Sequence, residues 1–143
     1  MRAKIITFFA IIMLSLGLQS CTIKPMVFDI VGEWGITETT FYWNKDVVNA
    51  EPSHSVFTNN YYWQFWDFQI NGALIVRDHN RNVEENGDFI YNTSKRKLTY
   101  RFYDNIYDAY RDADVTIVSP IEMIVTTHTY ASDTVYKMKK LKW

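Results

Sequence analysis

An internal disulfide bond is excluded by composition, because the 143-residue sequence contains a single cysteine, Cys21. One cysteine has no partner within the chain, even in an oxidising compartment. The folded part of the protein therefore depends on its hydrophobic core for stability.

Net charge is also nearly absent, since 15 Lys and Arg face 16 Asp and Glu. The sequence lacks the basic patch that nucleic-acid binding requires, so we expect no nucleic-acid partner. Lysines do gather near the C-terminus, at Lys137, Lys139, Lys140 and Lys142. Alternation along a final strand explains most of this cluster, and attraction to a membrane surface is the alternative explanation.

Long apolar runs are confined to the N-terminus. Arg2 and Lys4 precede an apolar run over residues 5–16, which is shorter than the ~18–20 residues of a permanent membrane-spanning helix. A short basic segment followed by a short apolar one is typical of a secretion signal.

The end of this signal, Leu18-Gln19-Ser20-Cys21, resembles the lipobox cut by the lipoprotein signal peptidase. The resemblance implies a lipoprotein signal peptide over residues 1–20 and attachment of membrane lipid to Cys21. Residues 21–29 then form the lipidated cysteine and a short tether, and residues 30–143 form one domain. The alternatives are an ordinary signal peptide or an N-terminal anchor helix, with Cys21 uninvolved.

The expected location is the cell envelope, with the protein held by its lipid anchor. Thr22-Ile23-Lys24 lack the acidic run associated with surface export in Bacteroidota. This favours an outer-membrane protein that faces the periplasm over one on the cell surface.

Aromatic residues are abundant: 5 Trp, 10 Tyr and 9 Phe make up 17% of the chain. They suit a pleated, half-buried sheet, and no segment beyond the signal has a sustained helical period. Alternation and turn residues predict eight strands, over residues 30–43, 61–70, 73–78, 88–92, 97–103, 114–118, 121–130 and 134–142. Residues 44–60, 79–87 and 104–113 are predicted loops. The predicted fold is all-β, an eight-stranded antiparallel up-and-down barrel without a C-terminal helix.

Four segments resemble the lipocalin-like lipoproteins of Bacteroidota, small barrels related in shape to the calycins. They are Gly32-Glu33-Trp34, residues 68–74, Leu98-Thr99-Tyr100 and residues 135–141. The resemblance implies that Gly32 and Trp34 form the barrel floor. Because the chain lacks the C-terminal helix and disulfides of true lipocalins, the ligands of the animal proteins do not carry over.

Two groups of aromatic residues are candidate ligand-binding sites. The first flanks the long predicted loop and includes Trp43, Tyr62, Trp63 and Trp66, whose rings would shape an apolar pocket at the barrel mouth; core packing is the alternative. The second is Tyr103, Tyr107 and Tyr110, interleaved with aspartates in a pattern that suits sugar or peptide binding. The alternative is that these tyrosines plug one end of the barrel.

Catalytic and metal-binding patterns are weak. The sequence has three histidines and no nucleophile motif, so we expect neither an enzyme nor a cofactor. The segment Asp78-His79-Asn80-Arg81-Asn82 begins like a calcium loop, but Val83 and Phe89 stand where that loop needs Gly and Glu. An Asx turn is the preferred interpretation, and no metal site is predicted.

Two functions follow as hypotheses. In the first, a membrane-tethered, non-enzymatic barrel holds a small apolar or amphipathic ligand. In the second, a filled barrel acts through its loops on an envelope partner or a host enzyme. The volume of the interior distinguishes them, because ligand binding needs a cavity of a few hundred Å³.

The lipid anchor yields the first testable prediction. The variant Cys21→Ser should lack lipid and should no longer remain with membranes after cell fractionation and a salt wash, because lipid at Cys21 is the expected anchor. A variant that stays membrane-bound after a salt wash would contradict the prediction.

Overall fold

The computed structural model of this protein describes residues 30–43, 51–57, 61–104 and 109–143. Within these residues the chain is all-β, as predicted, and every strand pairing is antiparallel. The strands are β1 (Gly32–Trp43), β2 (Ser53–Val56), β3 (Gln64–Phe68), β4 (Ala73–Asp78), β5 (Val83–Asn92), β6 (Lys97–Phe102), β7 (Arg111–Ser119), β8 (Glu122–His128) and β9 (Ser132–Lys142).

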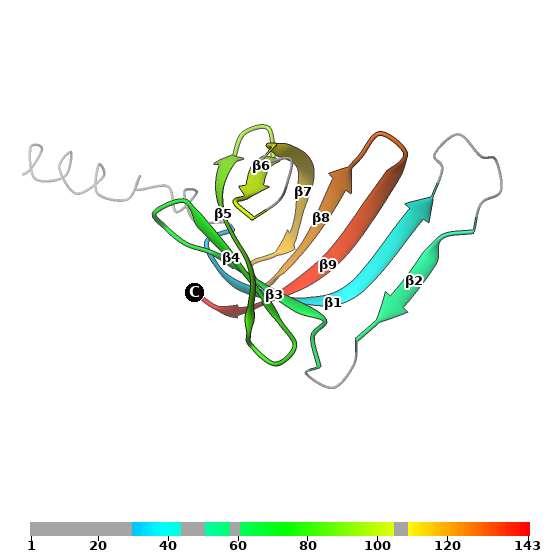
Figure 1. Cartoon of the computed structure of the whole chain (residues 1–143), viewed down its shortest axis with the longest axis horizontal. Helices are drawn as coiled ribbons and strands as arrows, with labels where there is room; N and C mark the ends of the chain where they lie inside the picture. Colours follow the sequence, from blue (N-terminus) through cyan, green and yellow to red (C-terminus); the bar gives the residue numbers. More distant parts are fainter. Residues whose placement is uncertain (1–29, 44–50, 58–60, 105–108) are drawn as a thin grey trace, which may run out of the picture.

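Eight of these strands form a closed barrel (Figure 1). The order is β1-β3-β4-β5-β6-β7-β8-β9, and β9 pairs with β1 to close the sheet. Each strand lies beside its neighbour in sequence apart from the inserted β2, which confirms the predicted up-and-down barrel. Closure removes the exposed edges that an open sheet of this size would present.

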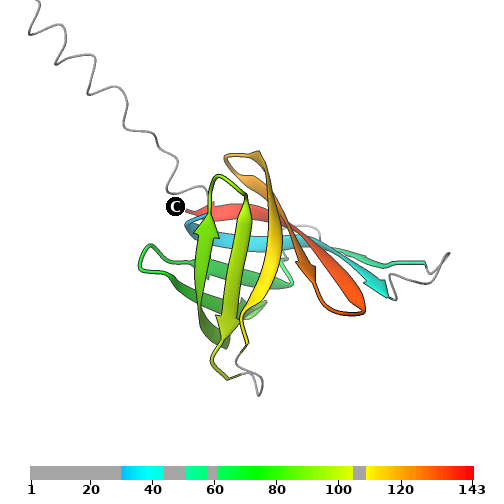
Figure 2. The ribbon, with the colours of Figure 1, turned by 90° about the horizontal axis from the view of Figure 1, so that it is seen from above.

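Strand β1 has two different neighbours along one edge. Its first part, from Gly32 to Gly35, pairs with β3, and its later part, from Glu38 to Phe41, pairs with β2. A register shift against β9 lies between these two parts, as expected of a β-bulge, which bends a strand and increases its twist. The later part of β1 therefore leaves the barrel wall, and β2, β8 and β9 extend with it (Figure 2).

We call this projecting end the mouth and the opposite end the base. The base holds the start of β1, the end of β9 and the turns β3–β4, β5–β6 and β7–β8. No helix in the described segments has the length and apolar character of a membrane span.

The prediction that residues 44–60 form only a loop was wrong, because Ser53–Val56 is strand β2. All four residues are exposed, only Val56 among them is apolar, and a proline precedes them, so they carry no alternating apolar signal. Pairing with the exposed later part of β1 makes them a strand, which no local pattern could indicate.

Several strand ends also differ from the prediction. β3 is shorter than residues 61–70, whereas β5, β7 and β9 begin at Val83, Arg111 and Ser132, earlier than expected. The added residues are mostly polar, and they become strand because a neighbouring strand continues beside them. The turn into β9 correspondingly lies at Thr129, whose backbone N–H donates to the Ser132 carbonyl, and not at Ser132-Asp133.

The predicted Asn71-Gly72 turn is confirmed. Gly72 has a φ of +87°, which a glycine adopts without strain, and its N–H donates to the Gln69 carbonyl at 2.9 Å. The Asn71 side-chain oxygen accepts from the N–H of Ala73. These bonds set the register of the β3–β4 hairpin.

The barrel interior is filled by apolar side chains from all eight strands. Trp66 lies near its centre, with 4% of its surface exposed, and its ring lies within 6.2 Å of the rings of Phe68, Tyr100, Phe102 and Tyr136. The described part of the core begins at Ile30.

Trp34 lies at the base, as the Gly-x-Trp resemblance implies. Its indole is fully buried, and Nε1 donates to the Ile30 carbonyl at 2.8 Å. Gly32 has a φ of +129°, and a Cβ at this position would collide with the Lys142 carbonyl oxygen. Glycine is therefore required where the strand enters the barrel.

Removing the indole of Trp34 tests this packing. Trp34→Ala should lower the free energy of unfolding by ~3–5 kcal/mol, a large share of the ~5–15 kcal/mol typical of such a domain. Trp66→Ala should have a similar effect because its ring is equally enclosed. The control Trp43→Ala should lose only ~0.5–1.5 kcal/mol, since its exposed ring keeps one aromatic contact. Urea unfolding of the three variants measures the difference; equal stability of Trp34→Ala and wild type would contradict the floor assignment.

Candidate functional site

The aromatic group predicted at the mouth divides between the core and the surface. Trp66 belongs to the core, which was the alternative explanation for it. Trp63 is 40% exposed and lies between Phe57 and Tyr136, with ring centroids 6.1 and 6.3 Å away and nearly parallel planes. Trp43 is 63% exposed and meets the ring of Phe41 edge-on at 4.3 Å.

The exposed rings of Trp43 and Trp63 and their half-buried aromatic neighbours share one face of the projecting sheet. Tyr136 of β9 pairs with Thr39 of β1, and residues directly opposite in a sheet point to the same face. Phe41 and Trp43 follow Thr39 at intervals of two and so point the same way. We call Phe41, Trp43, Phe57, Trp63 and Tyr136 the aromatic shelf.

Polar groups lie where the shelf meets the barrel interior. Burial raises the pKa of Tyr100 to about 12 and also raises that of Tyr136, so both hydroxyls stay protonated and can donate hydrogen bonds. The Thr39 hydroxyl is buried and has no hydrogen-bond partner among the described residues. The mouth therefore combines exposed rings with a few hydroxyl groups.

Tyr62 lies on the outer wall, away from the shelf. Its ring covers Gly35, where any Cβ would collide with it, and packs against Phe65 with centroids 5.6 Å apart. Its position is structural, because it covers the point at which Gly35 of β1 pairs with Phe65 of β3.

The predicted tyrosine group also lies outside the barrel. The guanidinium carbon of Arg101 lies 5.4 Å from the ring centre of Tyr103 and 4.7 Å from that of Tyr110, while Arg101 pairs with Asp88 at 2.9 Å. Tyr103 also donates to Asp88 at 3.0 Å. Although partial burial acts to raise the pKa of Asp88, the hydrogen bonds from Arg101 and Tyr103 outweigh it and lower that pKa. Tyr103 and Tyr110 thus surround an ion pair and do not plug the barrel; Tyr107 and Cys21 lie outside the described residues.

A histidine cluster connects strands β7, β8 and β9. The imidazole of His128 lies between two carboxylates, with Nδ1 2.8 Å from Asp133 and Nε2 2.9 Å from Asp114. Only the charged imidazole can donate to both, so the hydrogen bond to Asp133 and that to Asp114 raise the pKa of His128. Lys97 also pairs with Asp114 and, together with His128, lowers the pKa of this carboxyl.

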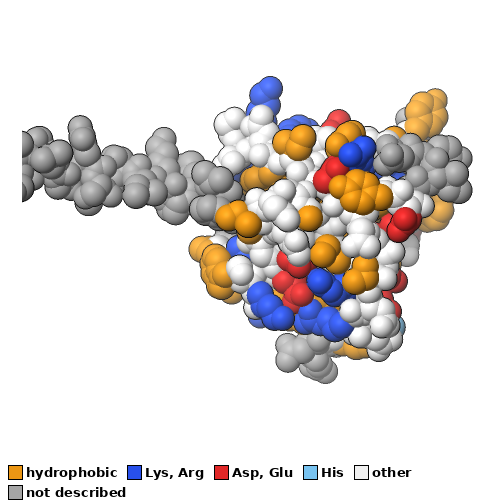
Figure 3. Space-filling model, turned by 60° about the vertical axis from the view of Figure 1, so that its left-hand side comes forward, with side chains coloured by type: hydrophobic (Ala, Val, Ile, Leu, Met, Phe, Trp, Pro, Cys, Tyr) orange, Lys and Arg blue, Asp and Glu red, His pale blue; other side chains and the backbone are white. Residues whose placement is uncertain are grey.

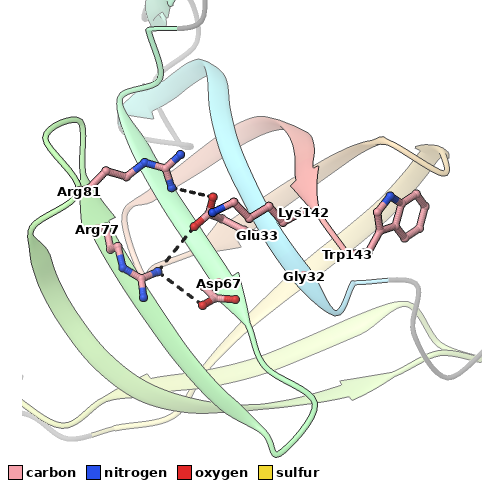
Figure 4. A pocket seen from close by; sticks show the side chains of 7 residues that line it. All are labelled: Gly32, Glu33, Asp67, Arg77, Arg81, Lys142 and Trp143. Atoms are coloured by element: carbon pink, nitrogen blue, oxygen red, sulfur yellow. Dashed lines mark hydrogen bonds and ion pairs between the residues drawn. The ribbon is translucent and has the colours of Figure 1, made fainter.

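A second concentration of charge lies on the outer wall toward the base (Figure 4). Arg81 donates to Glu33 at 2.6 Å, and Arg77 lies 3.7 Å from Glu33 and 3.5 Å from Asp67. These side chains, with Lys142 and Trp143, line a hollow of about 630 Å³. Three cations face two carboxylates, which leaves a positive surplus.

Arg81 is held in place by two contacts besides its backbone. Its φ of +71° is unusual for a non-glycine residue, and its guanidinium lies 3.7 Å above the ring of Phe65 while it pairs with Glu33. The surrounding turn is the predicted Asx turn, since Asp78 accepts hydrogen bonds from the N–H groups of Asn80 and Asn82. The described residues include no cluster of three or more acidic, histidine or cysteine side chains placed to hold a metal ion.

Sequence reasoning missed part of the shelf and all of the charged hollow. Phe41 and Tyr136 carry a usable signal, because strand alternation places each of them on a definite face. Phe57 carries none, since it lies beyond the polar strand β2. The pairing of Arg81 with Glu33 joins residues 48 positions apart and becomes visible only in the folded chain.

Fold and site together define a filled, closed β-barrel with an aromatic shelf on a projecting sheet and a charged hollow near its base. Searches against family models, curated proteins and solved structures find no match to this chain.

The His128 cluster yields a pH prediction. A pKa raised on folding means that the charged imidazole stabilises the fold below its ordinary value of 6.5, and that this stabilisation is lost as the pH rises through the raised pKa. The free energy of unfolding should therefore decrease between about pH 5 and about pH 8. His128→Gln should flatten this dependence and the control His79→Gln should retain it, as urea unfolding at the two pH values will measure. An unchanged slope in His128→Gln would remove the cluster as its cause.

Proposed function

We propose that this protein is a membrane-anchored, non-enzymatic interaction module that binds an extended polypeptide partner along the aromatic shelf. The observation that carries the proposal is the exposed shelf on a sheet that projects from a filled barrel. Anchoring through Cys21 in the cell envelope is supported by the lipobox resemblance and the preceding signal pattern.

The filled interior favours an interaction module over a ligand carrier. A barrel of eight strands is either filled by side chains or just wide enough for one small ligand. Here Trp66 and its four aromatic neighbours occupy the centre, and the hollow that Arg77 and Arg81 line is on the outer wall. Binding is therefore expected on the surface.

The exposed rings supply the binding energy that such a surface needs. Tryptophan and tyrosine are enriched at the centres of protein interfaces because they bury a large area with little loss of conformational entropy. Trp43 and Trp63 are both large and exposed. The stacking of Trp63 between Phe57 and Tyr136 holds it in position before a partner arrives, which lowers the entropic cost of binding.

Strand β2 favours a partner in an extended conformation. It forms the outer end of the described sheet and pairs with β1 on one side. An added strand can therefore hydrogen-bond to its other edge, as in recognition by β-augmentation. Alternate side chains of that strand would then point toward the shelf.

In-cell photocrosslinking tests the proposal on the full chain. A photoreactive phenylalanine analogue replaces Trp43, and the matched control carries it at Ile90, an equally exposed residue on the wall strand β5. We expect a crosslinked product with the mass of an added polypeptide at position 43 and none at position 90. The added substitution Trp63→Ala should abolish the product, because it removes the central ring of the stack.

Two results would overturn the proposal. Equal crosslinking at positions 43 and 90 would mean that the shelf has no special partner. A mass increase too small for a polypeptide would instead assign the shelf to a small amphipathic ligand.

A further inference from the structure

The base of the barrel carries its own set of exposed apolar side chains. Ile70 in the β3–β4 turn is 75% exposed, Ile121 in the β7–β8 turn is exposed, and Trp143 beyond β9 is 82% exposed. Single exposed apolar residues are ordinary, but these three lie on different elements that end at the same side of the molecule (Figures 1 and 2).

Cations surround these residues. Lys95 and Arg96 are exposed in the β5–β6 turn, and Lys139 and Lys142 are exposed near the end of β9. They face one exposed carboxylate, Glu122, at the start of β8. The described turns of the mouth carry charge of both signs, with the exposed Arg81 in the β4–β5 turn and the exposed Asp104 after β6. The exposed charge at the base is therefore mainly positive.

Two hollows meet at Trp143. One is the charged hollow of about 630 Å³ described above. The other, of about 510 Å³, is lined by Val31, Phe68 and Ile70 among others, and Trp143 borders both. Figure 3, in which the left-hand side of Figure 1 faces forward, shows basic and acidic side chains in one mixed patch with hydrophobic side chains nearby.

We propose that the base is a docking face for a phospholipid bilayer. Trp143 suits the membrane interface, where an indole lies at the level of the headgroups. Lys142, Lys139, Lys95 and Arg96 would lie against lipid phosphates, while Ile70 and Ile121 enter the boundary between headgroups and acyl chains. The paired apolar and cationic hollows at Trp143 match the two parts of a phospholipid.

The point at which the chain enters the barrel supports this occupant. Residues 1–29 lead to Ile30 at the base, and the segment between Cys21 and Ile30 spans at most about 30 Å when fully extended. The proposed lipid anchor therefore keeps the base near the membrane. Strand β1 has 12 residues from base to shelf, so docking would place the shelf up to about 40 Å from the bilayer and facing away from it.

The first test omits the anchor, so that it does not depend on the proposed lipidation. The chain from Thr22 onward, which contains the whole described core, is mixed with vesicles of equal parts phosphatidylethanolamine and phosphatidylglycerol, and bound protein is measured by sedimentation. We expect binding that weakens with salt. Lys142→Gln should lower the partition coefficient about fivefold, the factor expected for one cation near an anionic surface.

Matched controls separate the base from a general charge effect. Asn80→Asp lowers the net charge by one unit in a mouth turn, and it should leave the partition coefficient nearly unchanged. Trp143→Ser should lower binding, while Tyr130→Ser, at a fully exposed residue in the β8–β9 turn, should not. Absence of binding, or equal losses in Lys142→Gln and Asn80→Asp, would overturn the proposal.

The second test uses the full lipoprotein reconstituted into the same vesicles. Lipidation consumes the thiol of Cys21, so a cysteine introduced as Ile70→Cys or Tyr130→Cys is the only free thiol for an environment-sensitive fluorophore. The label at position 70 should shift to the blue and resist an aqueous quencher, whereas the label at position 130 should behave as in water.

The two failures are distinguishable. Equal quenching at both positions in reconstituted protein would overturn the docking face. A full chain whose Cys21 thiol reacts with the label, and which does not stay with vesicles, would instead count against the lipid anchor. In that case the vesicle sedimentation of the chain from Thr22 onward still decides whether the base is a docking face.

Discussion

The pairing of β1 with both β9 and β3 is the constraint on which the rest of this structure depends. It joins the two ends of the domain in sequence, and without it the sheet would remain open at both edges. The register shift between Ile36 and Glu38 then bends the same strand out of the wall. One strand thus supplies buried residues toward the base, Trp34 and Ile36, and rings at the mouth that are half-buried, as Phe41 is, or exposed, as Trp43 is.

The aromatic content serves two physical purposes in two places. Inside the barrel, Trp34 and Trp66 provide the volume that a disulfide-free domain needs for a stable core. On the projecting sheet, similar side chains are stacked against one another and partly exposed, as Trp63 is between Phe57 and Tyr136. Because aromatic and apolar side chains occupy the interior, the proposed binding sites are on the surface, at the two ends of the barrel.

Ion pairs between side chains stabilise the outer wall of the barrel, outside the apolar core. Glu33 is nearly buried on this wall, and two guanidinium groups, from Arg77 and Arg81, compensate its charge. A buried carboxylate without such partners would be strongly destabilising. Arg81 also covers Phe65, which faces outward from β3 yet is buried. The wall near the base is therefore charged, in contrast to the ring-covered mouth.

Local patterns in the sequence determined the fold class and the Asn71-Gly72 and Asp78–Asn82 turns. They also determined the alternation that puts Tyr136, Met138 and Lys140 on one face of their strand. Turn conformation and strand period are local properties, so a short stretch of sequence is enough to indicate them. The tertiary structure alone decided that Ser53–Val56 is a strand, that Trp66 is buried while Trp63 is exposed, and that Arg81 reaches Glu33. Alternation says which residues share a face, but it does not say which face is covered or what covers it. In residues 61–66 both faces of the strand carry aromatic rings. The closing of the barrel decides which face is buried inside, and the contacts of Tyr62 with Gly35 and of Arg81 with Phe65 cover part of the outer face. These outcomes depend on contacts between residues far apart in the chain, which no local pattern encodes.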